Sequence, residues 1–84
     1  MPDVDPAGAV KAAYEYLIRV TPEEYKKSYS SFRVEEIQTD KDGNYSITLS
    51  YDVAGQFGFD TKKEYKLFTV LKNGTVTGMV IKTL

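Results

Sequence analysis

The segment that most constrains the fold is a pair of β-rich runs on either side of the dipeptide Asn73-Gly74, within residues 64–83. These residue types best tolerate the positive φ angles of a two-residue type I′ turn, which predicts an antiparallel hairpin with Lys72 opposite Thr75. Counting outward, one face is expected to hold these pairs: Leu71 with Val76, Thr69 with Gly78, Leu67 with Val80, and Tyr65 with Lys82. The other face is expected to hold Val70 with Thr77, Phe68 with Met79, Lys66 with Ile81, and Glu64 with Thr83. Both faces are therefore apolar near their centres.

One helix covers only one face of such a hairpin, so the second apolar face needs another neighbour. We expect the face toward the helix to consist of Tyr65, Leu67, Leu71, Val76 and Val80. The patch that points away is then a candidate binding surface made of Phe68, Val70, Met79 and Ile81. With the faces reversed, the outward residues are instead Leu67, Leu71, Val76 and Val80. Three kinds of neighbour fit either patch: a second copy in a homodimer, another protein, or a ligand enclosed by an inward-curling sheet.

The N-terminal part of the chain predicts a helix from residue 6 to about residue 20. Asp5 is suited to the N-cap and Pro6 to the first helical position. An apolar stripe follows at spacings of three and four residues: Val10, Ala13, Tyr14, Leu17 and Ile18. Thr21, Pro22 and Glu24 form a capping-box pattern that predicts a short second helix from residue 22 to about 29. One helix kinked at Pro22 is the competing interpretation.

Four strands are expected after the helices, over residues 32–39, 45–53, about 61–71 and 75–83. In the first, a β-bulge near Glu35-Glu36 would bring three apolar residues to one face: Phe32, Val34 and Ile37. The second alternates apolar and polar residues without interruption, which is typical of a strand with one buried face. Short connections predict an antiparallel meander. The expected fold is a single α+β domain over residues 1–84, in the order α-α-β-β-β-β.

The residue types present exclude several kinds of chemistry. The chain has no histidine, cysteine or tryptophan, so histidine-assisted nucleophiles and histidine or cysteine zinc sites are excluded. No carboxylates are spaced as a shared acid–base site, and we expect no enzymatic activity and no cofactor. Eleven basic and twelve acidic residues give a net charge of −1, which argues against non-specific nucleic-acid binding. We expect no membrane association, since no membrane span is recognisable. If Met1 is the natural start, the absence of a signal-peptide pattern predicts a cytoplasmic location, and a removed signal or anchor is the alternative.

Two loops carry residues of interest. Asp40, Asp42 and Asn44 have the spacing of the first calcium ligands of an EF-hand, but Gly43 comes too early and no glutamate follows at position 12. We interpret this segment as a hairpin turn. In the loop of residues 54–60, Phe57 lies between Gly55 and Gly58, and Phe59 directly follows Gly58. They are predicted either to contact a partner, since aromatic residues bring large contact area, or to fold back over the open end of the core.

The helix opening DPAGAVKAAYEYL and the terminal hairpin EYKLFTVLKNGTVTGMVIK together resemble the cystatin-like and NTF2-like group of folds. The resemblance covers most of the chain in pattern and includes no specific motif. It implies a helix on a strongly bent four-stranded antiparallel sheet. Members of this group include ligand-binding pockets, enzymes and small accessory or dimerisation domains. The chain is short for an NTF2-like domain and lacks the pocket acids and histidines of enzymatic members, which favours the accessory role.

The leading hypothesis is a non-enzymatic interaction domain that forms a homodimer or docks on another protein through the outward apolar patch. The alternative is a small-molecule binding module with a cavity between helix and sheet. Its wall would include Tyr14, Tyr45 and Tyr51, whose hydroxyls provide polar contacts.

Overall fold

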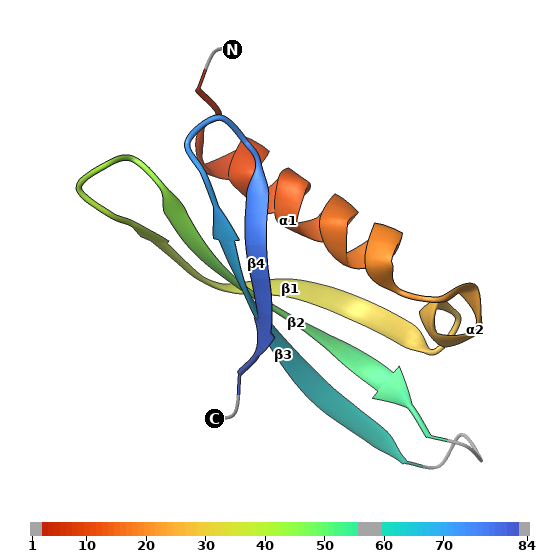
Figure 1. The fold of residues 1–84 in the computed structure, drawn as a ribbon. Coiled ribbons are helices and arrows are strands. Elements are labelled where there is room, and N and C mark those ends of the chain that lie inside the picture. The colour runs from red at the N-terminus through yellow and green to blue at the C-terminus, as the bar shows by residue number, and fades with distance from the viewer. Residues whose placement is uncertain (1–2, 56–59, 83–84) are drawn as a thin grey trace.

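The fold was analysed in a computed structural model, which describes residues 3–55 and 60–82. Two helices precede four strands: α1 (Pro6–Val20), α2 (Glu23–Lys26), β1 (Tyr29–Thr39), β2 (Tyr45–Ala54), β3 (Thr61–Val70) and β4 (Val76–Ile81). The strands form one antiparallel sheet in the order β1-β2-β3-β4, and α1 lies along one face of it (Figure 1). The α+β class, the element order and the meander are as predicted.

Helix α1 begins and ends as the sequence indicates. A carboxylate oxygen of Asp5 accepts a hydrogen bond of 2.8 Å from the Gly8 amide, which satisfies one of the free donors of the first turn. The side chains of Ala9, Ala13 and Leu17 are buried against the sheet. Two of these three are alanines, so the helix axis can lie close to the strands.

Helix α2 is shorter than the predicted range of residues 22–29. It spans a single turn, and its first turn has no side-chain capping hydrogen bond. The predicted cap is missing because the Thr21 hydroxyl donates instead to the Leu17 carbonyl, at 2.6 Å. The Thr21 amide donates to the same carbonyl. Thr21 therefore closes the C-terminal end of α1 and is not the N-cap of α2.

Strand β1 is bulged where the apolar pattern requires it. The register against β2 shifts between Val34 and Glu36, so that Val34 lies opposite Leu49 and Ile37 opposite Ile47, on the same face. A second shift, which the sequence did not indicate, lies between Ser30 and Arg33. At that position Ser31 has a φ of 55°, the only positive value among non-glycine residues that the structure describes.

The turn between β3 and β4 differs from the predicted type I′ turn. The Gly74 amide donates to the Leu71 carbonyl, and Leu71 pairs with Thr75 through its own amide, each at 2.8 Å. The loop therefore has three residues, Lys72 to Gly74, and only Gly74 has a positive φ, of 92°. The Asn73 side chain instead accepts a hydrogen bond from the Thr75 amide at 3.0 Å. This is a type I turn followed by a glycine bulge, which requires one positive φ where type I′ requires two.

The extra loop residue is compensated further along the hairpin. The register shifts again between Thr69 and Val70, where Val70 lies opposite Val76 and Thr77 has no partner. Beyond this shift the observed pairs are the predicted ones: Thr69 with Gly78, Phe68 with Met79, Leu67 with Val80, and Lys66 with Ile81. The predicted pair of Val70 with Thr77 is wrong, because it lies between the two irregularities.

The predicted assignment of hairpin faces is wrong. Phe68 and Val70 are fully buried under α1, and Met79 is half-buried against the same core. The reason is the pairing of β3 with β2, in which Phe68 lies opposite Ile47 and Val70 opposite Tyr45. Strand β2 is apolar on one face only, so its register decides which face of the hairpin turns toward the helix. The alternative with the faces reversed is correct for Leu67 and Val80, which lie on the outer face. It is wrong for Val76, which packs against the core because the register shift moves it to the helix face.

On the outer face of the sheet, opposite α1, long side chains from the edges of the sheet lie over its centre. In register across the four strands lie Glu36, Thr48, Leu67 and Val80. Lys82, next to the end of β4, reaches Glu36 on β1 with its ammonium nitrogen 3.4 Å from a carboxylate oxygen. Both side chains must lie across the two intervening strands to meet. Thr48 is buried on this outer face.

Candidate interaction surface

Strands β1 and β4 are the two edges of the sheet, and they differ in how well they are protected against pairing with another strand. Within β1 lie three charged residues, Arg33, Glu35 and Glu36, together with the two register shifts. Charges and bulges on an edge strand hinder the addition of a further strand. The β1 edge is therefore poorly suited to strand pairing.

Strand β4 differs from β1 in charge, and its one register shift, at Thr77, lies near its beginning. Its six residues, VTGMVI, include no charge and no proline. Val80 is 56% exposed on the outer face, and Ile81 is 74% exposed on the face that α1 covers only in part. An uncharged, apolar edge strand with free backbone groups is the usual template for strand addition.

The direction of the free backbone groups of β4 follows from its pairing with β3. The Lys82 amide donates to the Tyr65 carbonyl at 3.0 Å. Backbone groups alternate along an antiparallel strand, so those of Val80 also point toward β3, while those of Met79 and Ile81 point toward the free edge. The unpaired donors and acceptors of β4 therefore lie beside its two most apolar exposed positions.

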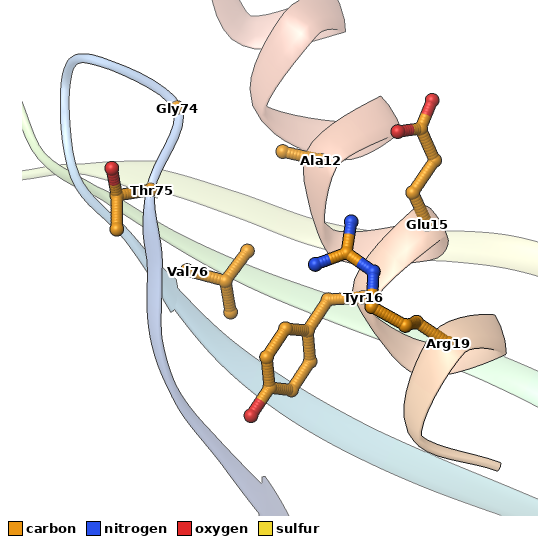
Figure 2. Close-up of a pocket in the computed structure, with 7 residues that line it drawn as sticks. All are labelled: Ala12, Glu15, Tyr16, Arg19, Gly74, Thr75 and Val76. Atoms are coloured by element: carbon orange, nitrogen blue, oxygen red, sulfur yellow. The ribbon is translucent and has the colours of Figure 1, made fainter.

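A groove runs between α1 and the beginning of β4, with a volume of about 270 Å³. Its walls come from the helix and from the end of the hairpin turn: Ala12, Glu15, Tyr16, Arg19, Gly74, Thr75 and Val76. Figure 2 shows Ala12 and Val76 pointing toward one another across the gap, and Glu15 pointing away from the strand. Glu15 lies 3.9 Å from Lys11, and no ion pair of Arg19 is present among the described residues.

A smaller depression of about 120 Å³ lies on the other side of α1, toward β1. It is lined by Val10, Tyr14, Phe32, Arg33, Val34 and Leu49. On this side Val34 and Ile37 are 46% and 42% exposed. The helix thus covers the centre of the sheet and leaves apolar side chains accessible along both edges.

The predicted patch is only partly at the surface. Phe68 and Val70 belong to the core, Met79 lies at its margin, and Ile81 alone is exposed. Phe57 and Phe59 lie outside the described residues. Val80 was placed on the wrong face by the sequence. A signal for the β4 edge was nevertheless present, since residues 76–81 have no charge whereas β1, β2 and β3 each include charged residues.

The three tyrosines proposed for a ligand cavity do not line a common pocket: of the two pockets described above, one includes Tyr14 and neither includes Tyr45 or Tyr51. The Tyr45 hydroxyl donates to the Val4 carbonyl at 3.0 Å, and the Tyr51 hydroxyl donates to a Glu64 carboxylate oxygen at 2.9 Å. Tyr14 packs edge-on against Phe32 with ring centroids 5.0 Å apart, and Tyr51 packs against the same Phe32 ring with centroids 5.5 Å apart. Burial and the hydrogen bond to Glu64 raise the pKa of the Tyr51 hydroxyl.

The Asp40 segment is the hairpin turn that the sequence indicates. A carboxylate oxygen of Asp40 accepts hydrogen bonds from the amides of Asp42 and Asn44, each at 2.9 Å. Over residues 3–55 and 60–82, no group of three or more acidic, histidine or cysteine side chains is arranged to hold a metal ion. In the same part of the chain, no helix is both long and apolar enough to cross a membrane.

Comparisons with family models, with curated proteins and with solved structures found no match to this chain.

Proposed function

We propose that this chain is a non-enzymatic interaction domain that binds a protein partner along the free edge of β4. The observation that carries the proposal is the contrast between the two edges. Strand β1 has charges and two register shifts, whereas β4 has neither charge nor proline and exposes Val80 and Ile81. Sheet edges left in this state invite an added strand.

The groove beside β4 extends this surface onto the helix. A partner strand paired with β4 would place alternate side chains toward α1, where Tyr16 and Arg19 line the groove, and the others beside Val80. Backbone hydrogen bonds would supply affinity and the groove would supply selectivity, as in other cases of strand addition.

The alternative of a small-molecule module has less support, because the hydroxyls of Tyr45 and Tyr51 are already bonded to Val4 and Glu64. The likeness to cystatin-like and NTF2-like folds and the cytoplasmic location are part of the proposal. The likeness to these folds is supported by the element order.

The test uses a library of displayed peptides, selected on the purified domain. Peptides that bind the unmodified domain are then tested on Ile81→Lys, which puts a charge on the β4 edge, and on the matched control Ile37→Lys on β1. We expect binding to weaken at least tenfold in Ile81→Lys and to persist in Ile37→Lys, because a lysine on the β4 edge opposes the addition of a strand there.

Amide hydrogen exchange supplies a second readout. A bound peptide should slow exchange at Met79 and Ile81, whose amides point toward the free edge. Selection of no peptide that depends on β4, or protection confined to β1, would contradict the proposed function.

A further inference from the structure

The β4 edge is complementary to itself. Because β4 has no charge, two copies can approach without like-charge repulsion between the strands. Of its exposed side chains, Val80 lies on the outer face and Ile81 on the helix face. A partner strand of the same sequence would therefore offer apolar contacts on both faces of the extended sheet.

We infer that the partner at this edge is a second copy of the chain, an inference that rests on the proposed function. The two β4 strands would pair antiparallel, related by a two-fold axis at Val80. In this arrangement Val80 faces Val80 of the second copy on the outer face. Met79 and Ile81 face each other across the axis on the helix face. Their free backbone groups are the ones that would form the new hydrogen bonds.

The residues that flank the pairing also fit this arrangement. Counting from Val80, Lys82 lies opposite Gly78 of the second copy, so no charged side chain meets another of the same sign. The Lys82 ammonium is already engaged with Glu36, 3.4 Å away, across the outer face. Gly78, which has no side chain, leaves space beside it.

Residues 78–82 contain the whole of the predicted contact and lie beyond the register shift at Thr77. The pairing therefore uses the regular part of β4. Strand β1 offers no comparable stretch, because its two register shifts interrupt the alternation of free backbone groups along the strand. A two-fold interface uses the same patch on both chains, which is the commonest way in which identical chains associate.

A contact made by one short strand buries less surface than the roughly 1,200–2,000 Å² of stable protein interfaces. We therefore expect a reversible dimer that dissociates on dilution. Sedimentation velocity over a range of protein concentrations up to about 1 mM measures this directly.

The decisive experiment is a charge exchange at Val80. Val80→Asp and Val80→Lys, each alone, place like charges opposite one another at the axis and should weaken dimerisation at least tenfold. An equimolar mixture of the two variants should restore association through the opposite charges. Because Val80 is 56% exposed, both variants should retain the fold, which circular dichroism checks. Ile37→Asp on β1 is the control, and should dimerise like the unmodified chain.

Three results would overturn the inference. These are a monomer at every concentration, a dimer that both Val80 variants leave unchanged, and single variants that dissociate but are not restored by mixing. None of these results contradicts the proposed function, which is tested separately by peptide binding at β4. If the natural partner is a different protein, peptides should still bind at β4 although the chain does not dimerise.

Discussion

Thr48 is 2% exposed on the outer face of the sheet, and within the described residues its hydroxyl has no hydrogen-bond partner. Its neighbour in register on β1 is Glu36, whose carboxylate is engaged with Lys82. Ser50, two residues along β2, has a partner, since its hydroxyl donates to Glu35 at 2.6 Å. A buried hydroxyl without a partner costs free energy that a methyl group of the same shape does not.

We therefore predict that Thr48→Val stabilises the domain by about 1 kcal/mol, the order of the cost of an unsatisfied buried polar group. Unfolding in urea, followed by circular dichroism, measures the change. Thr69→Val is the matched control, because Thr69 lies on the same face of the adjacent strand but is exposed, and should change stability little. A loss of stability in Thr48→Val would mean that the hydroxyl makes a contact that its replacement removes.

Tyr51 predicts a dependence of stability on pH. Burial, followed by the hydrogen bond to Glu64, raises its pKa above the ordinary value of about 10. The folded state therefore keeps the proton at a pH where the unfolded chain releases it. Because the unfolded state then binds fewer protons, stability is complete below pH 10 and falls as the pH rises above it.

In Tyr51→Phe this group no longer titrates, so the fall in unfolding free energy between pH 9 and 11 should be smaller, by up to about 1.4 kcal/mol per pH unit. Urea unfolding at each pH gives the curve. The control Tyr25→Phe, which removes a hydroxyl from a side chain that is 56% exposed, should keep the slope of the unmodified chain. Equal slopes for all three proteins would contradict the prediction.

At the scale of elements, the two hairpin turns are built alike but differ in their surroundings. Gly43 and Gly74 have φ angles of 85° and 92°, which favour glycine at both positions. A β-carbon at Gly74 would lie 3.2 Å from a methyl carbon of Val4, whereas one at Gly43 would meet nothing closer than 3.7 Å. The turn before β4 thus also supports the segment that leads into α1.

Both Gly43→Ala and Gly74→Ala are predicted to destabilise the domain by about 1–2 kcal/mol through backbone strain, with the larger loss at Gly74. Thermal unfolding of the two variants compares them. Combining Gly74→Ala with Val4→Ala should remove the excess loss, since the crowded methyl group is then absent. If the two single variants are equal, Val4 does not limit the space at the turn.

At the scale of the whole molecule, one end of the sheet is tied to the start of the helix. The Val4 amide donates to the Lys72 carbonyl at 2.8 Å, and the Asn44 side chain accepts from the Lys72 amide at 3.0 Å. With the Tyr45 bond to Val4, these contacts connect both hairpin turns to the N-terminal segment. They fix where α1 crosses the sheet (Figure 1).

The spacing between α1 and the sheet depends on the fully buried alanines Ala9 and Ala13. We predict that Ala13→Leu destabilises the domain by about 1–3 kcal/mol, because the added carbons must displace the helix or the strands beneath it. Ala7→Leu, on the exposed face of the same helix, is the control and should have little effect. Urea unfolding measures the free energy of unfolding of both variants. If Ala13→Leu is as stable as Ala7→Leu, the helix can shift away from the sheet without loss of stability, which would contradict the prediction.

The sequence by itself determined the elements of this protein, because their signals are local. The N-cap at Asp5, the bulge beside Glu35 and the alternation of β2 each depend on neighbours along the chain, and each was predicted. The meander follows from the short connections. The sequence also indicated a sheet surface as the candidate site, because the last hairpin is apolar on both faces.

Tertiary structure alone decided which side of that hairpin is a surface. The hairpin is apolar on both faces, so its own sequence does not fix which face turns toward α1. That choice is set by the register against β2, in which Phe68 lies opposite Ile47 and Val70 opposite Tyr45. The same register buries two of the predicted binding residues and leaves Val80 and Ile81 exposed. A strand pattern fixes which residues share a face, but only its pairing with a one-sided neighbour fixes which face meets the helix.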